Sequence, residues 1–145
     1  MDSETFESQS ADSLNVQDAI LPNPWQSIPD SEKHYKIIFE LGADDIAPEG
    51  YVRLAKTASL MKENPNMEVT ITGHTDNVGQ AAYNVTLSQK RADFAKKFLV
   101  GMGIAPGRIT SIGKGSEEPV ADNDSEAGRL MNRRVEVVLN IPNEF

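Results

Sequence analysis

The spacing of apolar residues changes along this chain, and each change predicts a boundary between structural elements. In residues 68–73, Val69 and Ile71 alternate with polar residues, and most side chains are β-branched. An apolar period of two in β-branched residues is typical of a half-buried strand. Residues 75–79 are rich in turn formers, so we expect the strand to end in a polar loop.

An amphipathic helix is predicted after this loop. Apolar residues recur at helical spacing from Leu87 to Leu99, and glycines at positions 101 and 103 end the pattern. Arg91 falls on or beside the apolar stripe of this helix. Because an unpaired guanidinium is costly to bury, we expect Arg91 to find an anion or to reach solvent.

The rest of the chain adds three strands and two helical segments. The strands are predicted over residues 34–40, 108–112 and 133–141, a helix over 49–63, and a short helical segment from a Ser125 cap to Met131. In the order βαβαββ, the first two helices can join parallel strands through right-handed crossovers. The pattern therefore predicts an α+β fold, with a mixed parallel and antiparallel sheet and its helices packed on one face.

Charge divides the chain into two parts. The 145 residues carry a formal net charge of -8, but residues 1–32 hold seven acidic residues and no lysine or arginine. We therefore expect residues 1–33 to form an acidic, largely disordered linker and residues 34–142 to form one folded domain. The near-neutral balance of the folded part argues against nucleic acid and against an anionic lipid surface as partners.

The proline-containing stretch LPNPW lies in the predicted linker and is expected to be extended. Trp25 is expected to act as a packing anchor, with Leu21 and Ile28 as neighbours. No apolar run approaches the ~18 residues of a membrane helix, and no signal peptide stands at the start. We therefore expect any membrane attachment to come from a part of a parent protein outside this sequence.

An acidic and a basic residue flank the predicted strand-loop-helix unit. Asp76 lies in the loop and Arg91 lies on the helix. The two could hold a small zwitterion, with Asp76 accepting from an ammonium group and Arg91 donating a bidentate fork to a carboxylate. They could instead form an internal ion pair that ties the loop to the helix, and the residues alone slightly favour this second interpretation.

Four ordered blocks carry a resemblance to a known family. GHTDNVG, YNVTLSQKRA, GKGSEEPVADND and GRLMNRRVEVVL resemble the OmpA-like (OmpA/MotB/Pal) peptidoglycan-binding domain over roughly residues 35–140. The resemblance implies the OmpA-like fold and non-catalytic binding of peptidoglycan, through the free zwitterionic end of diaminopimelate in the stem peptide. The family's ligand-binding aspartate falls on Asp76 and its ligand-binding arginine on Arg91, so the resemblance favours binding over an internal pair.

Further candidate positions surround this pair. Thr75 and Asn77 flank Asp76 and can offer hydroxyl, amide or backbone donors. Many relatives carry a polar residue just after the first strand, where this chain has Leu41 and Gly42, so a ligand contact at Gly42 must come from the backbone.

Two consecutive arginines begin the predicted last strand, and in a strand only one of them can face the site. Arg134, in the block that lies near the ligand pocket in the family, is the predicted one, and Arg133 is the alternative. Asn84 and Ser88 are expected to hold the loop and to start the helix.

The sequence argues against catalysis and against a metal site. His74 lies two residues before Asp76, and a cell-wall hydrolase could use such a pair, but neither a nucleophile nor a set of metal ligands accompanies it. Asp122 and Asp124 suggest a calcium loop, but Ala127 stands where that loop requires glycine. We therefore expect a protein that is not an enzyme and that uses no cofactor and no metal.

The expected function is to anchor a larger protein of the periplasm or cell envelope to peptidoglycan. The alternative is an assembly or dimerisation module of a motor stator or secretion system, in which wall binding is secondary or lost. Association as a homodimer is left open by the sequence.

Overall fold

The protein is described by a computed structural model, which covers residues 24–41, 43 and 45–142. The elements follow one another along the chain in this order: α2 (Pro24–Ser27), α3 (Asp30–Lys33), β1 (His34–Ile38), α4 (Pro48–Glu63), β2 (Glu68–Gly73), α5 (Ala81–Gly101), the 3-10 turn η1 (Pro106–Arg108), β3 (Ile109–Gly113), α6 (Glu126–Asn132) and β4 (Arg134–Asn140).

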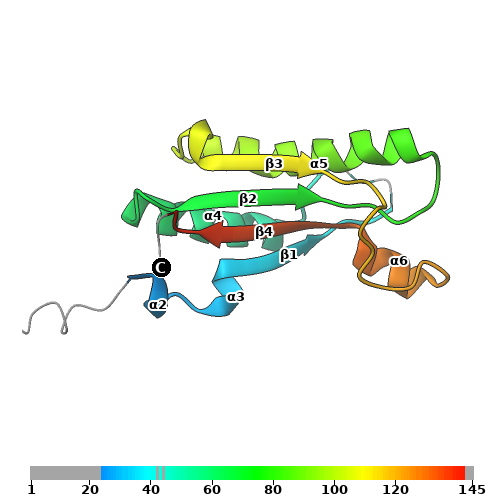
Figure 1. Cartoon of the computed structure of the whole chain (residues 1–145), viewed down its shortest axis with the longest axis horizontal. Helices are drawn as coiled ribbons and strands as arrows, with labels where there is room; N and C mark the ends of the chain where they lie inside the picture. The colour runs from blue at the N-terminus through cyan, green and yellow to red at the C-terminus, as the bar shows by residue number, and fades with distance from the viewer. Residues whose placement is uncertain (1–23, 42, 44, 143–145) are drawn as a thin grey trace, which may run out of the picture.

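The four strands form one mixed sheet in the order β1-β4-β2-β3. The last strand, β4, runs antiparallel to both of its neighbours, whereas β2 and β3 are parallel. In the register of the sheet, Ile71 lies opposite Val137 of β4 and opposite Ser111 of β3. Figure 1 shows α4 and α5 on the same side of this sheet. The predicted α+β fold, with a mixed sheet and helices packed on one face, is therefore confirmed.

The core lies between the sheet and the two long helices. Alternate residues of each central strand face this layer, because side chains of a strand point to opposite faces in turn. The fully buried apolar residues that meet there are Val69 and Ile71 of β2, Val135 and Val137 of β4, Leu54, Ala58 and Met61 of α4, and Ala92, Ala95 and Leu99 of α5.

Two glycines bring α5 close to the sheet. A Cβ atom on Gly73 would lie 2.0 Å from the carbonyl oxygen of Ser88, and one on Gly113 would lie 2.3 Å from the backbone nitrogen of Gln89. Real Cβ atoms do not approach other atoms so closely. Only glycine therefore allows the ends of β2 and β3 to contact the α5 backbone directly, one turn before Arg91.

Several chain segments meet at one edge of the sheet. The ends of β1, β2 and β3 point to this edge, and α6 lies beside it (Figure 1). The hydroxyl of Ser125 accepts a hydrogen bond from the Gly128 N–H at 3.0 Å, which confirms the predicted cap of α6. Loops from four different parts of the sequence are thus gathered into one place.

The first and last strands are shorter than predicted at this edge. The N–H of Phe39 donates to the carbonyl of Arg133 at 2.7 Å, just beyond the end of β1. Arg133 is the C-cap residue of α6 and not the first residue of β4. Its N–H donates to the carbonyl of Arg129 at 3.1 Å, so the helix and not the sheet determines its backbone.

The predicted linker is only partly described. Residues 1–23, and Leu21 with them, lie outside the described residues, so the disorder expected for the linker is not tested. Residues 24–33 contain two short helices, and Pro24 begins α2, where the stretch was expected to be extended. Proline suits the first turn of a helix. Ile28 is buried and Trp25 packs against the core, as expected of a packing anchor.

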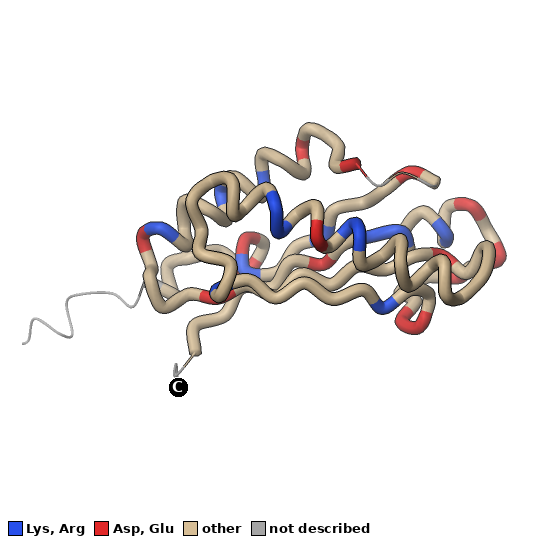
Figure 2. Tube along the Cα trace, turned by 90° about the horizontal axis from the view of Figure 1, so that it is seen from above, with Lys and Arg blue, Asp and Glu red and all other residues tan. Residues whose placement is uncertain are grey.

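Charge and hydropathy are unremarkable across the described part of the chain. None of its helices combines the length and the apolar character that crossing a membrane requires. In Figure 2, acidic and basic positions are interspersed along the trace, and neither sign gathers over one side in that view.

Candidate functional site

A pocket of about 190 Å³ opens at the edge where β1 and β2 end. It brings together residues from the loops after both strands, from α5 and from the start of β4. The residues that line it are Leu41, Thr75, Asp76, Val78, Gly79, Tyr83, Asn84, Leu87, Arg91 and Arg133. The structure thus gathers three of the predicted site residues, namely Thr75, Asp76 and Arg91.

The carboxylate of Asp76 is held from two sides. Its Oδ1 accepts a hydrogen bond from the Val78 N–H at 3.0 Å, and its Oδ2 accepts one from Arg133 Nη1 at 2.8 Å. The side chain of Asp76 is only 5% exposed. Beside it, the Thr75 hydroxyl donates to the Asp76 carbonyl at 2.7 Å, and the Thr75 N–H donates to the Gly115 carbonyl at 2.9 Å. The loop after β2 therefore fixes the orientation of this carboxylate.

Arg91 is fully buried on α5 and crosses the floor of the pocket. Its Nε donates to the Ala43 carbonyl at 2.7 Å, Nη1 to the His74 carbonyl at 3.3 Å and Nη2 to the Glu40 carbonyl at 3.4 Å. The guanidinium carbon lies 4.7 Å from the centre of the Phe39 ring. Arg91 thus connects α5 to the loop after β1 and to the end of β2. The ion pair that the structure describes for Asp76 is formed with Arg133, and not with Arg91 as the internal-pair interpretation required.

Arg133 completes a buried polar network. Besides Asp76, it binds the Phe39 carbonyl through Nε at 3.1 Å and Glu126 Oε2 through Nη2 at 2.7 Å. Burial by itself would lower the pKa of this guanidinium, but hydrogen bonds to Glu126 and Asp76 outweigh it and raise the pKa. The hydrogen bond from Arg133 in turn lowers the pKa of Glu126. Both groups are therefore ionised at neutral pH.

The sequence-based choice between the two consecutive arginines is not supported by this geometry. Arg134 does not line the pocket. Its Nε donates to Glu136 Oε2 at 2.6 Å and its Nη2 to the Glu118 carbonyl at 2.9 Å. By alternation, Arg134 shares the sheet face of Glu136, whereas position 133 shares the face of Val135, which α5 covers. The periodicity of the last strand therefore contained the signal that favours Arg133.

Comparisons with known proteins agree with this geometry. A model of the OmpA family matches residues 38–133. This chain belongs to the OmpA family. The family is a non-catalytic, peptidoglycan-binding one, so the expectation that the protein is not an enzyme is confirmed.

Two relatives and one solved structure illustrate the match of this OmpA-like domain. It is 47% identical over 98 residues to outer membrane porin F from Pseudomonas fluorescens, which covers 68% of this chain and 30% of that protein. It is 39% identical over 104 residues to the peptidoglycan-binding protein ArfA from Mycobacterium tuberculosis, covering 72% of this chain and 32% of that protein. The chain thus spans about a third of the length of these relatives.

The crystal structure of the peptidoglycan-associated lipoprotein from Burkholderia pseudomallei superposes with a TM-score of 0.70 at 28% identity. That match covers 72% of this chain and 89% of the lipoprotein chain.

The other residues that the sequence predicted for the site differ in where the structure places them. Asn77 is exposed and does not line the pocket, and Gly42 lies outside the described residues. Asn84 and Ser88 have the structural roles expected of them. Asn84 donates to the Val78 carbonyl at 3.0 Å, and the Ser88 hydroxyl accepts from the Gly115 N–H at 2.9 Å.

His74 lies behind the pocket and does not line it. It is buried, and its Nδ1 has no hydrogen-bond partner among the residues that the structure describes. Burial, and after it the positive charge of Arg134, lower its pKa. Within residues 24–41, 43 and 45–142, no group of three or more potential metal ligands comes together. The described part of the domain therefore offers neither a general base beside Asp76 nor a metal centre.

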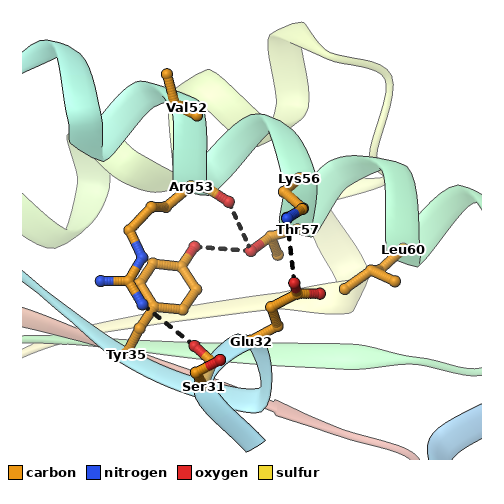
Figure 3. Close-up of a pocket in the computed structure, with 8 residues that line it drawn as sticks. All are labelled: Ser31, Glu32, Tyr35, Val52, Arg53, Lys56, Thr57 and Leu60. Atoms are coloured by element: carbon orange, nitrogen blue, oxygen red, sulfur yellow. Dashed lines mark hydrogen bonds and ion pairs between the residues drawn. The ribbon is translucent and has the colours of Figure 1, made fainter. Parts of the chain in front are cut away.

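A second pocket, of about 280 Å³, lies at the other end of β1, between α3 and α4 (Figure 3). Its charged groups are engaged with each other: Lys56 pairs with Glu32 at 3.1 Å, and Arg53 stacks over the Tyr35 ring while donating to the Ser31 carbonyl at 3.2 Å. These contacts connect α3 and β1 to α4. This second pocket is therefore part of the packing interface between α3, β1 and α4, and it is not the site that the four family-like blocks form.

Proposed function

We propose that this OmpA-like domain binds peptidoglycan through the free zwitterionic end of diaminopimelate in the stem peptide. In this way it would anchor a larger protein of the cell envelope to the wall. The observation that carries the proposal is the pocket itself, in which the buried carboxylate of Asp76 lies with the guanidinium groups of Arg91 and Arg133.

The ligand's two charges match the two signs of charge in the pocket. The carboxylate of Asp76, already oriented by the loop after β2, accepts from the ligand's ammonium group. Arg91, supported by Arg133, donates to the ligand's carboxylate, since a guanidinium fork suits a planar carboxylate. Thr75 lies beside Asp76 on the same wall of the pocket. Hydrogen bonds to charged groups contribute about 1.5–3 kcal/mol each, so a few of them support an affinity in the micromolar to millimolar range.

The relatives support both the ligand and the location. ArfA is named a peptidoglycan-binding protein, the Burkholderia protein is a peptidoglycan-associated lipoprotein, and porin F is an outer membrane protein. On these grounds we assign this domain to the periplasmic side of the cell envelope. Membrane attachment would come from the part of a parent protein that this chain does not span.

An NMR titration of the isotope-labelled domain tests the proposal. Meso-diaminopimelate should shift amide resonances of residues 73–91 and 132–134, and Asp76→Ala or Arg91→Ala should abolish the shifts while the spectrum still shows a folded protein. Arg53→Gln is the matched control, since it removes a guanidinium from the other pocket and should leave the titration unchanged.

Two analogues separate the contributions of the ligand's charges. Cadaverine keeps both ammonium groups of diaminopimelate without its carboxylates, and pimelate keeps both carboxylates without the ammonium groups. Each should bind more weakly than diaminopimelate, because each supplies only one of the two kinds of charge that the proposed contacts recognise. Equal affinity for all three compounds, or a flat titration with diaminopimelate, would reject the proposal.

Association of two copies, the basis of the alternative assembly function, remains a prediction. Analytical ultracentrifugation of the chain with and without residues 1–33 tests it. A monomer in both cases would remove the dimerisation module from consideration.

A further inference from the structure

Arg133 connects the closed interior of the pocket to its open rim. Its side chain is 2% exposed, and two of its three nitrogens are bound to buried acceptors, Asp76 and the Phe39 carbonyl. The third, Nη2, is bound to Glu126, whose side chain is 63% exposed. Of the three side-chain contacts of Arg133, which itself lines the pocket, the contact with Glu126 is therefore the one made to an exposed partner.

Glu126 has a second partner on its own helix. While Oε2 accepts from Arg133 at 2.7 Å, Oε1 accepts from Arg129 Nε at 3.2 Å, three residues further along α6. Arg129 is partly exposed, and its Nη1 is held by the Asn123 carbonyl at 2.9 Å. A small rotation of the Glu126 side chain toward Arg129 thus releases Arg133 without leaving the carboxylate unpaired.

We propose that Glu126 is a displaceable stand-in for the ligand's carboxylate, which holds the solvent-facing arm of Arg133 until a ligand replaces it. The inference rests on the proposed function, since it needs an anionic group to enter the pocket. In the free protein, Glu126 neutralises Arg133 together with Asp76. On binding, the ligand's carboxylate takes the position on Nη2 and Glu126 remains with Arg129.

Glu126 therefore lowers affinity and raises selectivity. A ligand must exchange one ion pair for another, so only a carboxylate that Arg91 also binds, on a ligand whose ammonium group is held by Asp76, competes well. A lone carboxylate offers Arg133 no more than Glu126 already does. This role differs from a purely structural one. If Glu126 served only to orient Arg133, it would strengthen ligand binding, and its removal would weaken ligand binding.

Isothermal titration of meso-diaminopimelate into wild type and Glu126→Gln tests the inference. An exposed ion pair contributes little, so the variant should bind roughly two- to fivefold more tightly. Asp124→Asn is the matched control, because it removes a negative charge from the same segment without touching a described contact of Arg133, and it should bind like wild type.

A pH series separates the stand-in from a purely structural role by the direction in which the ratio of the two affinities changes. Protonation of Glu126 in the wild type has the same effect as the substitution, and the hydrogen bond from Arg133 lowers the pKa of Glu126. The affinity of Glu126→Gln divided by that of the wild type should therefore fall toward one as the pH is lowered below the ordinary range of glutamate, whereas for a structural role it would rise toward one. Titrations of the ligand cancel in this ratio, because both proteins bind the same ligand.

The outcomes separate the two proposals. If the wild type binds and Asp76→Ala does not, the proposed function stands, and equal or weaker binding by Glu126→Gln then overturns the stand-in alone. If Asp124→Asn tightens binding as much as Glu126→Gln, the tighter binding is a general effect of removing negative charge, and the stand-in proposal is overturned. If neither wild type nor Glu126→Gln binds diaminopimelate, both proposals fall.

Discussion

Asp76 and Arg133, which are 57 residues apart in the sequence, form an ion pair of 2.8 Å whose two side chains are almost completely buried. The pair joins the loop after β2 to the junction between α6 and β4. It gives the buried Asp76 carboxylate an ionic partner when no ligand is bound, so the site exists before binding and need not be assembled by the ligand.

This pair should be important for stability. Arg133→Ala leaves the Asp76 carboxylate buried without its ionic partner and also leaves the Phe39 carbonyl without its side-chain donor. Breaking a buried ion pair typically costs about 3–5 kcal/mol of unfolding free energy. Urea denaturation followed by circular dichroism measures the loss. Because Glu126 is largely exposed, Glu126→Ala should cost clearly less, and similar losses in the two variants would contradict this account.

The two consecutive arginines should differ in ligand binding. Arg133→Gln removes a positive charge from the pocket lining, so we expect the affinity for diaminopimelate to fall about tenfold or more, the effect of losing one charged hydrogen bond. Arg134→Gln removes a charge that is bound to Glu136 and to the Glu118 carbonyl, and the affinity should stay within about twofold of wild type. Titration calorimetry on both variants distinguishes them, and the reverse order would restore the sequence-based choice of Arg134.

Stability should depend on pH through His74. Burial, followed by the charge of Arg134, lowers the pKa of His74 in the folded protein below its ordinary value of 6.5. The unfolded chain therefore binds the proton more readily, so stability is fully present above about pH 6.5 and is lost as the pH falls from that value through the folded-state pKa.

Unfolding free energies measured between pH 7.5 and pH 5 should fall in the wild type, and His74→Gln should flatten this part of the curve. His34→Gln is a suitable control, since its ring is exposed at the far end of β1 and the slope should persist. A wild-type curve that is level over this range would show that His74 has the same pKa in the folded and unfolded states.

The close contact at Gly73 predicts a strong effect of a small substitution. In Gly73→Ala the new methyl group would lie 2.0 Å from the Ser88 carbonyl oxygen, so α5 must shift away from β2. Overpacking of this kind costs about 1–3 kcal/mol, and thermal melting should show it. Gly107→Ala adds the same methyl group where no atom lies within 4 Å, and it should leave the melting temperature nearly unchanged.

The same shift should reach the pocket, because Arg91 lies on α5 one turn after Ser88. We expect Gly73→Ala to weaken diaminopimelate binding even at temperatures where the variant is folded. A variant with reduced stability but wild-type affinity would show that α5 relaxes locally without moving Arg91.

Much of the fold was readable from the sequence because local periodicity and tertiary burial agree. Val69 and Ile71 alternate and are buried, and Ser125 caps α6 as its residue type predicts. The ends of β1 and β4 were misplaced, because they depend on a contact between Phe39 and Arg133, which are 94 residues apart. Periodicity within one segment carries no information about such a contact.

The sequence predicted which charged residues line the pocket better than it predicted which of them form an ion pair with each other. Asp76 and Arg91 do line one pocket, as the family blocks implied. The partner of Asp76, however, depends on which of two adjacent arginines turns toward the helix layer. Arg133 takes that place because its position shares the face of Val135, and Glu126 joins the network because it lies seven residues earlier, about two turns away on the same face of α6.

The contacts of Gly73 and Gly113 with α5 have a consequence for engineering. They position Arg91 by contacts between the α5 backbone and the sheet backbone. Leu41, Val78 and Tyr83, at the mouth of the pocket, are 54–67% exposed, and Val78 contacts Asp76 and Asn84 only through its backbone. These three residues can therefore be varied in a mutant library without moving the charged residues that line the pocket. Variants from such a library would keep the proposed recognition of a zwitterion. Some of them would capture other amino-acid termini from a mixture.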